Sequence, residues 1–474
     1  MRGNYQQRNI GMPEPEAMAV NVRLALGVVA AFSVLVLCMG YAGWFVILLP
    51  IAALGAAMVV KDADNSGLGI CVLLCISFSY YFSLGQIPDL VTAIRIAIIA
   101  LFAICFLRIQ KGANEYKNAT ALLVLFFIIA AASSYKNSLY VWISELKALF
   151  AALFFLGLIF SAQRRARFPS VHFAVIVAVA VLSVAVFFVN PIIGYAYFID
   201  PNAAFSASGK FSGILNHPQL LACLLAVNIP LLLHAFVASR GLASGIAFLA
   251  LVASLLINAV SSSRTGVLAL TVALAVSLYF LKKNRDPMVA SKVNNVITLI
   301  GFGAVVALAT SYEELQMFIY KTDDLAGGIR LSGRDEIMAA SWRGFVANPI
   351  FGNGFQVPSD FTEHLGSTYG VSSDATSIEK CFFLTMLLEE VGLVGTLLFL
   401  AAIVSLIRTW LCKGAYVSVA GMAAFLTINL GEACILSPSS IGGLCWLSIF
   451  AAHNLTFRPD EPGPRYDPDR RGLY

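Results

Sequence analysis

The chain has 474 residues, of which 59% are hydrophobic and only 12% are charged. Ordinary soluble domains carry about 25% charged residues, so this composition excludes a soluble fold and predicts a polytopic membrane protein. The net charge of +5, from 31 Lys and Arg against 26 Asp and Glu, gives no reason to expect a nucleic-acid partner.

Long unbroken apolar runs favour membrane-spanning helices over a transmembrane barrel. A run of about 17–25 apolar residues is long enough to cross the hydrocarbon core of a bilayer. Polar interruptions in the third to sixth runs leave the expected number of spans at about 12–14. The runs lie near residues 22–40, 42–60, 68–84, 89–107, 119–134, 139–161, 171–189, 217–237, 243–260, 264–281, 293–310, 380–408, 415–432 and 439–456. The sequence therefore predicts an all-α polytopic membrane helix bundle.

Basic residues in the short loops predict the orientation of this bundle. They cluster within residues 108–117, 164–167, 282–292 and 408–413. With fourteen spans and the amino terminus inside, every cluster falls on the cytoplasmic side, as the positive-inside rule requires. Both termini are then cytoplasmic, and the loops 190–216, 261–264 and 311–378 face outward.

This topology divides the chain into five parts. They are a cytoplasmic tail (1–21), a membrane bundle (22–310), a long extracytoplasmic loop with short helices (311–378), C-terminal membrane helices (379–456) and a disordered cytoplasmic tail (457–474). Long loops in compact proteins are usually functional, so the loop 311–378 is a candidate for part of a site.

Three ionisable residues within the early spans are expected near the outer leaflet: Arg95, Glu145 and Lys147. Charged groups inside a membrane are costly and are candidates for function. They could line a polar cleft that binds substrate, or form an ion-pair cluster that holds helices in register. The sequence leaves both interpretations open.

The eighth span is preceded by Asn216 and His217, which we expect to begin a helix with Pro218 at its second or third position. The free backbone amides of this first turn face outward and could bind an anion. A simple helix cap is the alternative interpretation.

The outer turn Ser261-Ser-Ser-Arg264-Thr-Gly266 lies between two predicted spans. Its hydroxyls, its turn amides and a permanently charged guanidinium suit a phosphate group. Alternatively, Arg264 only extends from the membrane toward water.

The long loop contains Gly328-Ile-Arg330-Leu-Ser332-Gly-Arg334-Asp335-Glu336. Ser332 is predicted to cap a helix with Asp335 at the third position. Met338, Trp342, Phe345 and Val346 give this helix an apolar face, and Asn348-Pro349 ends it. The helix could lie on the outer membrane surface or cover a cleft.

Arg334 stands in the first turn of this predicted helix, where a cation is unfavourable against the helix dipole. A role in stability does not explain it, whereas an arginine beside free first-turn amides makes sense as an anion site, with Arg330 close by in sequence. We therefore predict that both arginines bind substrate.

Where the long loop returns to the membrane, Glu379 could act as an external general base and Lys380 could bind substrate. Both residues could instead mark only the water interface. His364 in the long loop could titrate near neutral pH, although it could equally be only solvated. Gly392 and Gly395 further on are expected to allow close helix contacts.

Four motifs occur in order over residues 205–400, and together they resemble the O-antigen ligase/Wzy polymerase superfamily of bacterial envelope glycosyltransferases. They are Phe211-Ser-Gly with Asn216-His-Pro, Ser263-Arg264-Thr-Gly266, Ser332-Gly-Arg334 leading to Asn348-Pro-Ile-Phe-Gly352-Asn-Gly354, and Leu388-Glu-Glu390-Val-Gly392-Leu-Val-Gly395.

The resemblance implies glycan transfer from an undecaprenyl-pyrophosphate donor at the outer face of the bacterial plasma membrane. It implies an inverting enzyme that needs neither a metal nor a cofactor. Arg264 and Arg334 would hold the donor pyrophosphate, and Glu379 or His364 would be the base. The implied partners are the lipid-linked oligosaccharide, membrane lipids and other polysaccharide assembly and export proteins.

One departure bears on the acceptor. Ligases of this superfamily usually carry a His-Asn pair where the long loop re-enters the membrane, and here the chain reads Glu379-Lys380-Cys381-Phe382. This difference favours a polysaccharide polymerase, with a ligase acting on lipid A-core or protein as the alternative. A transporter or flippase of lipid-linked glycans is the alternative of another class, but the inverted repeats that it would need are not evident.

Overall fold

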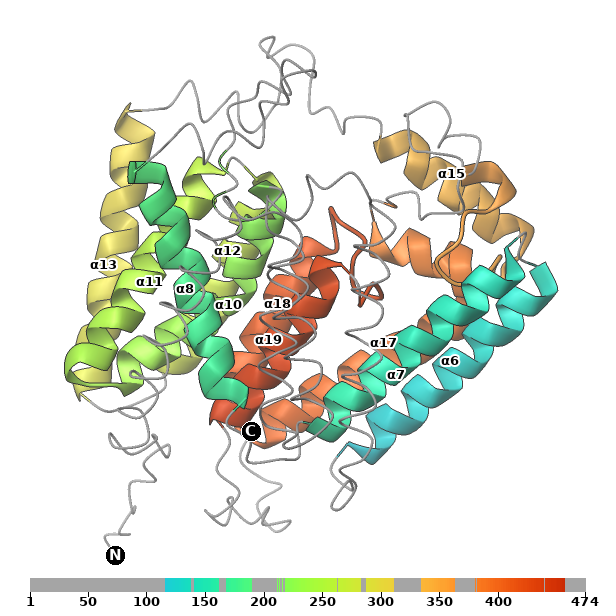
Figure 1. The fold of residues 1–474 in the computed structure, drawn as a ribbon, viewed down its shortest axis with the longest axis horizontal. Helices are drawn as coiled ribbons and strands as arrows, with labels where there is room; N and C mark the ends of the chain where they lie inside the picture. The colour runs from blue at the N-terminus through green and yellow to red at the C-terminus, as the bar shows by residue number, and fades with distance from the viewer. Residues whose placement is uncertain are drawn as a thin grey trace, which may run out of the picture.

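The computed structural model describes residues 116–137, 140–161, 168–189, 211, 213, 215, 218–261, 263–282, 287–310, 334–362, 380, 382–438 and 440–456. Within these residues the secondary structure is helical and contains no β-strand. The all-α fold that the sequence predicts is therefore confirmed (Figure 1). The first four predicted spans lie outside the described residues.

Six described helices are long and apolar enough to cross a membrane. They are α6 (Lys117–Asn137), α7 (Val141–Ser161), α10 (Pro218–Ala238), α11 (Gly241–Val260), α12 (Arg264–Lys282) and α17 (Phe383–Cys412). The other helices at predicted spans are α8 (Phe168–Val189), α13 (Pro287–Thr310), α18 (Tyr416–Ile428) and α19 (Ile441–Thr456). Each coincides with a predicted apolar run, so the chain is a multi-pass membrane protein.

The helices form two groups (Figure 1). In one group α10 is central and packs against α8, α11, α12, α18 and α19. In the other group α6 packs against both α17 and α7, and α7 also contacts α19. Most of α10 is buried, including Pro230 within the helix. A proline is tolerated there because neighbouring helices can compensate for the lost backbone hydrogen bond.

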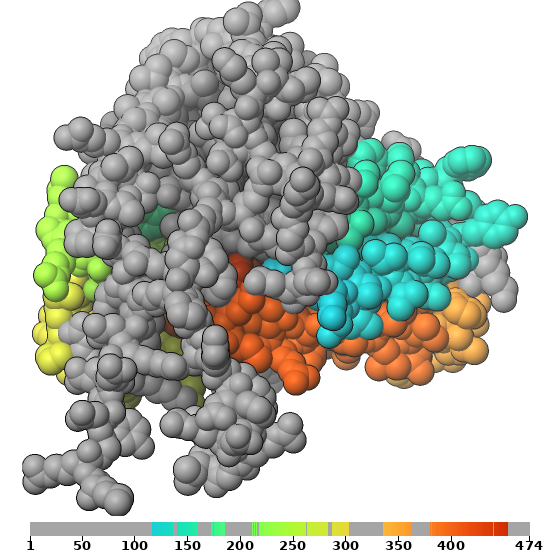
Figure 2. Space-filling view, turned by 90° about the horizontal axis from the view of Figure 1, so that it is seen from below, coloured from blue at the N-terminus to red at the C-terminus, as the bar shows by residue number. Residues whose placement is uncertain are grey.

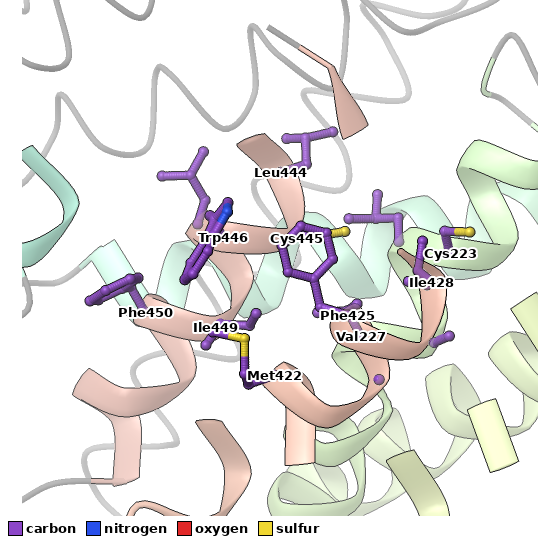
Figure 3. Close-up of a cluster of buried hydrophobic side chains, with 14 of the residues drawn as sticks. Cys223, Val227, Met422, Phe425, Ile428, Leu444, Cys445, Trp446, Ile449 and Phe450 are labelled. Carbon is purple, nitrogen blue, oxygen red and sulfur yellow. The ribbon is translucent and has the colours of Figure 1, made fainter. Parts of the chain in front are cut away.

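A cluster of buried apolar side chains lies where α10, α18 and α19 meet (Figure 3). Cys223 and Val227 of α10 lie near Ile428 and Phe425 of α18, and Trp446 of α19 packs edge-on against Phe425. Trp446 also donates a hydrogen bond from Nε1 to the carbonyl of Ile435 at 2.7 Å. Close packing of this kind holds helices together in a membrane, where lipid is as apolar as the core.

Helix α17 is broken at Gly392, which has φ 65° and ψ −170°. Residues other than glycine rarely adopt this conformation. The predicted run 380–408 is therefore one span in sequence but two helical segments in space. The short helix α15 (Arg334–Ala347) packs against the first segment (Figure 1).

Several helix ends share one side of the bundle with α15 (Figure 1). The starts of α10, α12, α17 and α19 lie on this side, together with the turn between α11 and α12. We call it the α15 side, and it is the side that the sequence predicts to face outward.

Candidate functional site

The segment 348–354 docks into the break in α17. Amides of the segment donate to carbonyls that the break exposes, from Asn353 to Glu389 at 2.8 Å and from Gly354 to Glu390 at 3.0 Å. In the other direction, the amide of Leu393 donates to the carbonyl of Pro349 at 2.8 Å. The docked segment thereby satisfies backbone groups that would otherwise lack partners at a break inside a helix.

Two glycines make this docking possible. A Cβ atom on Gly352 would lie 2.5 Å from the carbonyl carbon of Glu390, and one on Gly392 would lie 2.3 Å from the carbonyl oxygen of Ile350. The close contact expected at Gly392 therefore exists, but its partner is the segment 348–354 and not another helix. A Cβ atom on Gly395 would lie 3.6 Å from Ile129 of α6, as expected for a helix contact.

Beside the break, Lys380 forms a buried ion cluster with Glu389 and Glu390. Its Nζ atom lies 3.1 Å from Oε2 of Glu389 and 3.0 Å from Oε1 of Glu390. The three residues are 6%, 0% and 2% exposed. Burial lowers the pKa of Lys380, but the two carboxylates outweigh burial and raise that pKa above its usual value. Lys380 therefore stays charged between its partners.

Polar groups from residues 356–362, which follow the docked segment, also contact the ion cluster. Ser359 donates from Oγ to Oε1 of Glu389 at 2.6 Å, and Oγ1 of Thr362 lies 3.0 Å from the same oxygen. The backbone of Gln356 forms a hydrogen bond with the carboxylate of Glu390. Gly344 of α15 lies directly against this group, because a Cβ atom there would be 2.9 Å from Cγ of Glu389. The cluster thus joins α15, the loop and α17.

The hairpin of α6 and α7 holds the same loop from its other side. Lys147 donates from Nζ to the carbonyl of Gln356 at 2.7 Å, and it lies close enough to Glu390 to interact electrostatically. Ser144 donates to the carbonyl of Phe355 at 2.8 Å. A hydrogen bond therefore links Lys147 to the backbone at Gln356. Glu145, on the same helix, is partly exposed.

Hydrogen bonds connect the ion cluster to the start of α10. The carbonyl of Lys380 accepts from the amide of Ala433 at 3.1 Å. Next to Ala433, Glu432 accepts from Nε2 of Gln219 at 2.5 Å. Gln219 stands in the first turn of α10. The adjacent residues Glu432 and Ala433 therefore link this helix start to Lys380 of the ion cluster through hydrogen bonds.

The start of α12 packs directly against α10, since a Cβ atom on Gly266 would lie 2.7 Å from that of Ala222. Ser263 is buried and accepts a hydrogen bond from the amide of Gly266 at 3.1 Å. Ser261 is also buried, and donates to the carbonyl of Asn258 at 3.1 Å. These two hydroxyls therefore stabilise helix ends, whereas Arg264, the first residue of α12, is partly exposed.

Residues 249–400 match the family model described as O-Antigen ligase. This region is similar to the O-antigen ligase family. The match covers about a third of the chain, and it contains Arg264, Arg334, the docked segment and the break in α17. A search of curated proteins found no match. The match confirms the resemblance to the O-antigen ligase/Wzy superfamily that the sequence motifs indicate, and it supports a membrane enzyme of the ligase/polymerase kind.

Four predicted site residues have described side chains, namely Glu145, Lys147, Arg264 and Lys380. The last two lie within the matched residues 249–400. The structure brings Lys147 and Lys380 to the same buried group and places Arg264 at a connected helix start. The backbone of Arg334 is described as the first residue of α15. Outside the described residues lie Arg95, Asn216, His217, Arg330, His364 and Glu379. The predicted roles of all these residues stay predictions.

The described part of α10 starts at Pro218 and that of α15 starts at Arg334. The residues just before these positions, 216–217 and 331–333, lie outside the described residues. The predicted positions of Pro218 and Asp335 within their first turns therefore stay predictions.

Sequence reasoning missed the docked segment and the ion cluster. A signal was present in Glu389 and Glu390, two adjacent carboxylates inside an apolar run, because buried carboxylates require a cation or hydrogen-bond donors. Ser359 and Thr362 gave no comparable signal, since hydroxyl residues are common in loops.

Proposed function

We propose that this O-antigen ligase-like enzyme is a glycosyltransferase that polymerises glycan repeat units carried on undecaprenyl pyrophosphate. The reaction takes place at the outer face of the bacterial inner membrane, with both termini in the cytoplasm. The enzyme inverts the configuration of the sugar and needs no metal.

The observation that carries this proposal is the placement of two arginines at helix starts. Arg264 is the first residue of α12 and Arg334 the first residue of α15, and both helices begin on the α15 side. A helix start offers free amides, and a guanidinium beside them binds phosphate oxygens well. This combination suits the pyrophosphate of a lipid-linked donor.

In the proposed reaction an acceptor hydroxyl attacks the anomeric carbon of the donor, and the bond from that carbon to the pyrophosphate oxygen breaks. Arg264 and Arg334 stabilise the negative charge on the departing pyrophosphate. Glu379 or His364 takes the proton of the attacking hydroxyl.

Lys380 has a setting that favours a positioning role over direct substrate binding. Its ammonium group is buried between Glu389 and Glu390 and donates to the carbonyl of Val357 at 3.1 Å. Glu379 precedes it in the chain, so the ion cluster restrains the backbone next to the candidate base.

Reconstitution tests the function directly. Purified full-length protein in vesicles receives a defined undecaprenyl-pyrophosphate oligosaccharide, with or without lipid A-core, and the products are separated by size. A ladder from the donor alone supports the polymerase, and one addition that requires lipid A-core supports the ligase alternative. Movement of the donor across the vesicle membrane without any product would identify a transporter and contradict the proposal.

Matched variants test the two arginines. We expect Arg264→Ala and Arg334→Ala to slow product formation about a hundredfold or more, as for other groups that stabilise a charged transition state. Arg240→Ala and Arg343→Ala are the controls, because both side chains are exposed and neither stands at the start of α12 or α15. Arg240 precedes α11, at the end of that helix far from the turn to α12, and Arg343 lies in the second half of α15. Unchanged rates in both test variants would contradict the proposal.

A further inference from the structure

The exposed surface of α15 changes from polar to apolar along the helix. Its first turn exposes Asp335 and Glu336. Its last two turns expose Trp342 and Val346, which are 50% and 61% accessible. On the opposite face, Ala340 is fully buried where α15 packs against α17. The outward surface of the second half of α15 is therefore largely apolar, with Arg343 as the charged residue exposed there.

The apolar surface continues from α15 onto α17. Ile350 follows α15 and is 58% exposed, and its carbonyl accepts a hydrogen bond from the amide of Val394 at 3.3 Å. Leu393 and Leu397 of α17 are 49% and 58% exposed beside it. Figure 2 shows α15 lying beside α17 at the end of the group formed by α6, α7 and α17.

Along α17, the exposed apolar residues form one stripe. Leu393, Leu397, Val404 and Leu411 follow one another at intervals of four or seven residues, which places them on one face of a helix. Because α17 is long and apolar enough to span a membrane, this face is the one that contacts lipid. The apolar surface of α15 is continuous with it.

We propose that α15 is an interfacial helix whose second half is immersed in the outer leaflet of the bilayer. Its lipid face consists of Trp342, Val346, Ile350 and Phe351, while the charged first turn stays in water. Tryptophan is enriched at membrane interfaces, and an amphipathic interfacial helix buries its apolar face at the boundary of headgroups and acyl chains. The proposal stands whatever reaction the enzyme performs.

This arrangement decides between the two positions that the sequence leaves open for the helix. The face that packs inward is held by Gly344 against Glu389, and the outward face is held by lipid. Helix α15 is therefore a fixed element at the membrane surface and does not open and close over a cleft. Arg334, at the opposite end from the lipid face, then lies with the charged first turn on the water side of the lipid headgroups.

A fluorescent probe measures the immersion. In a full-length chain whose nine cysteines are replaced, one cysteine is introduced by Val346→Cys or Ile350→Cys and labelled with an environment-sensitive fluorophore. The protein is reconstituted in phosphatidylcholine vesicles. Glu336→Cys is the control for water and Val404→Cys the control for lipid. All four side chains are at least partly exposed in the folded protein, so the label does not disturb the core.

We expect blue-shifted emission at positions 346 and 350, strong quenching by doxyl-labelled phosphatidylcholine and little quenching by iodide, as at position 404. Position 336 should show the reverse. Iodide quenching at 346 and 350 as strong as at 336 would overturn the proposal. Protection from both quenchers would also overturn it, because protein and not lipid would then cover the face.

A second measurement uses the unmodified chain. A lipid-soluble diazirine is activated in vesicles that contain the wild-type protein, and labelled peptides are identified by mass spectrometry. Labelling within residues 342–351, as within the α17 stripe, supports the proposal. Labelling of α17 without any labelling of 342–351 overturns it.

Discussion

Replacing Gly392 by alanine tests whether the break in α17 and the docked segment are required. Alanine at φ 65° and ψ −170° is strained, and its Cβ atom would lie 2.3 Å from the carbonyl oxygen of Ile350. Pro349 and Ile350, at the start of the docked segment, must then move away. That movement removes the hydrogen bonds from Leu393 to Pro349 and from Val394 to Ile350.

The expected cost follows from these two effects. Strain in this backbone region costs about 1–3 kcal/mol. Each lost hydrogen bond costs about 0.5–1.5 kcal/mol, so the pair of bonds costs about 1–3 kcal/mol. Gly392→Ala should therefore destabilise the protein by about 2–6 kcal/mol. We expect Gly352→Ala to act in the same way, because its Cβ atom would lie 2.5 Å from the carbonyl of Glu390.

The assay compares apparent melting temperatures of purified variants in one detergent at one heating rate, together with the rate of product formation. Gly245→Ala is the matched control. Gly245 lies within α11 with nothing within 4 Å of its Cβ position, so alanine should be neutral or stabilise by up to about 1 kcal/mol. If Gly392→Ala melts and reacts like Gly245→Ala, the docked segment is not held by the break and the reasoning is refuted.

Further predictions concern the charged groups. Lys380→Met leaves Glu389 and Glu390 buried without their cation, so we expect it to destabilise the protein by about 3–5 kcal/mol. Its melting temperature should be lower than that of Lys117→Met, a control at an exposed lysine. Ser359→Ala removes one hydrogen bond to Glu389 and should cost about 1–3 kcal/mol; an unchanged melting temperature would argue against that bond. Burial lowers the pKa of Lys413 from 10.5 to about 8. Between these two pH values the unfolded chain binds more protons than the folded protein, so the stability of the fold should rise with pH. Lys413→Met should abolish this rise, measured as melting temperature against pH.

The membrane fold follows closely from the sequence, and the reason is physical. A helix that crosses lipid needs a long apolar run, so composition alone defines it. Ten described helices coincide with predicted runs, and their ends differ from the predicted ones by at most six residues. The break in α17 did not follow, because Gly392 lies inside an apolar run and glycines are common in membrane helices. Only the docked segment, distant in sequence, makes a break at that position stable.

For the candidate site, the sequence indicated which residues stand at helix starts but not what the side chains contact. Arg264 and Arg334 stand at helix starts, as their motifs indicate. The partner of Lys147 could not be predicted, because it is the backbone carbonyl of Gln356 in a loop more than two hundred residues further along the chain. Such contacts depend on tertiary packing, which leaves no periodic pattern in the sequence.

The ion cluster also explains why a buried lysine and two glutamates are placed at a break in a membrane helix. Replacing such a cluster by apolar residues often leaves stability unchanged or raises it, so its value lies in specifying one arrangement. Here Glu389 and Glu390 have their cation and their hydrogen-bond donors only when Lys380 and the segment 356–362 are both in place. An apolar core would allow the segment to slide along α17, whereas the cluster allows one register. That register also positions α15, because Gly344 packs on Glu389, and α15 carries Arg334 at its start.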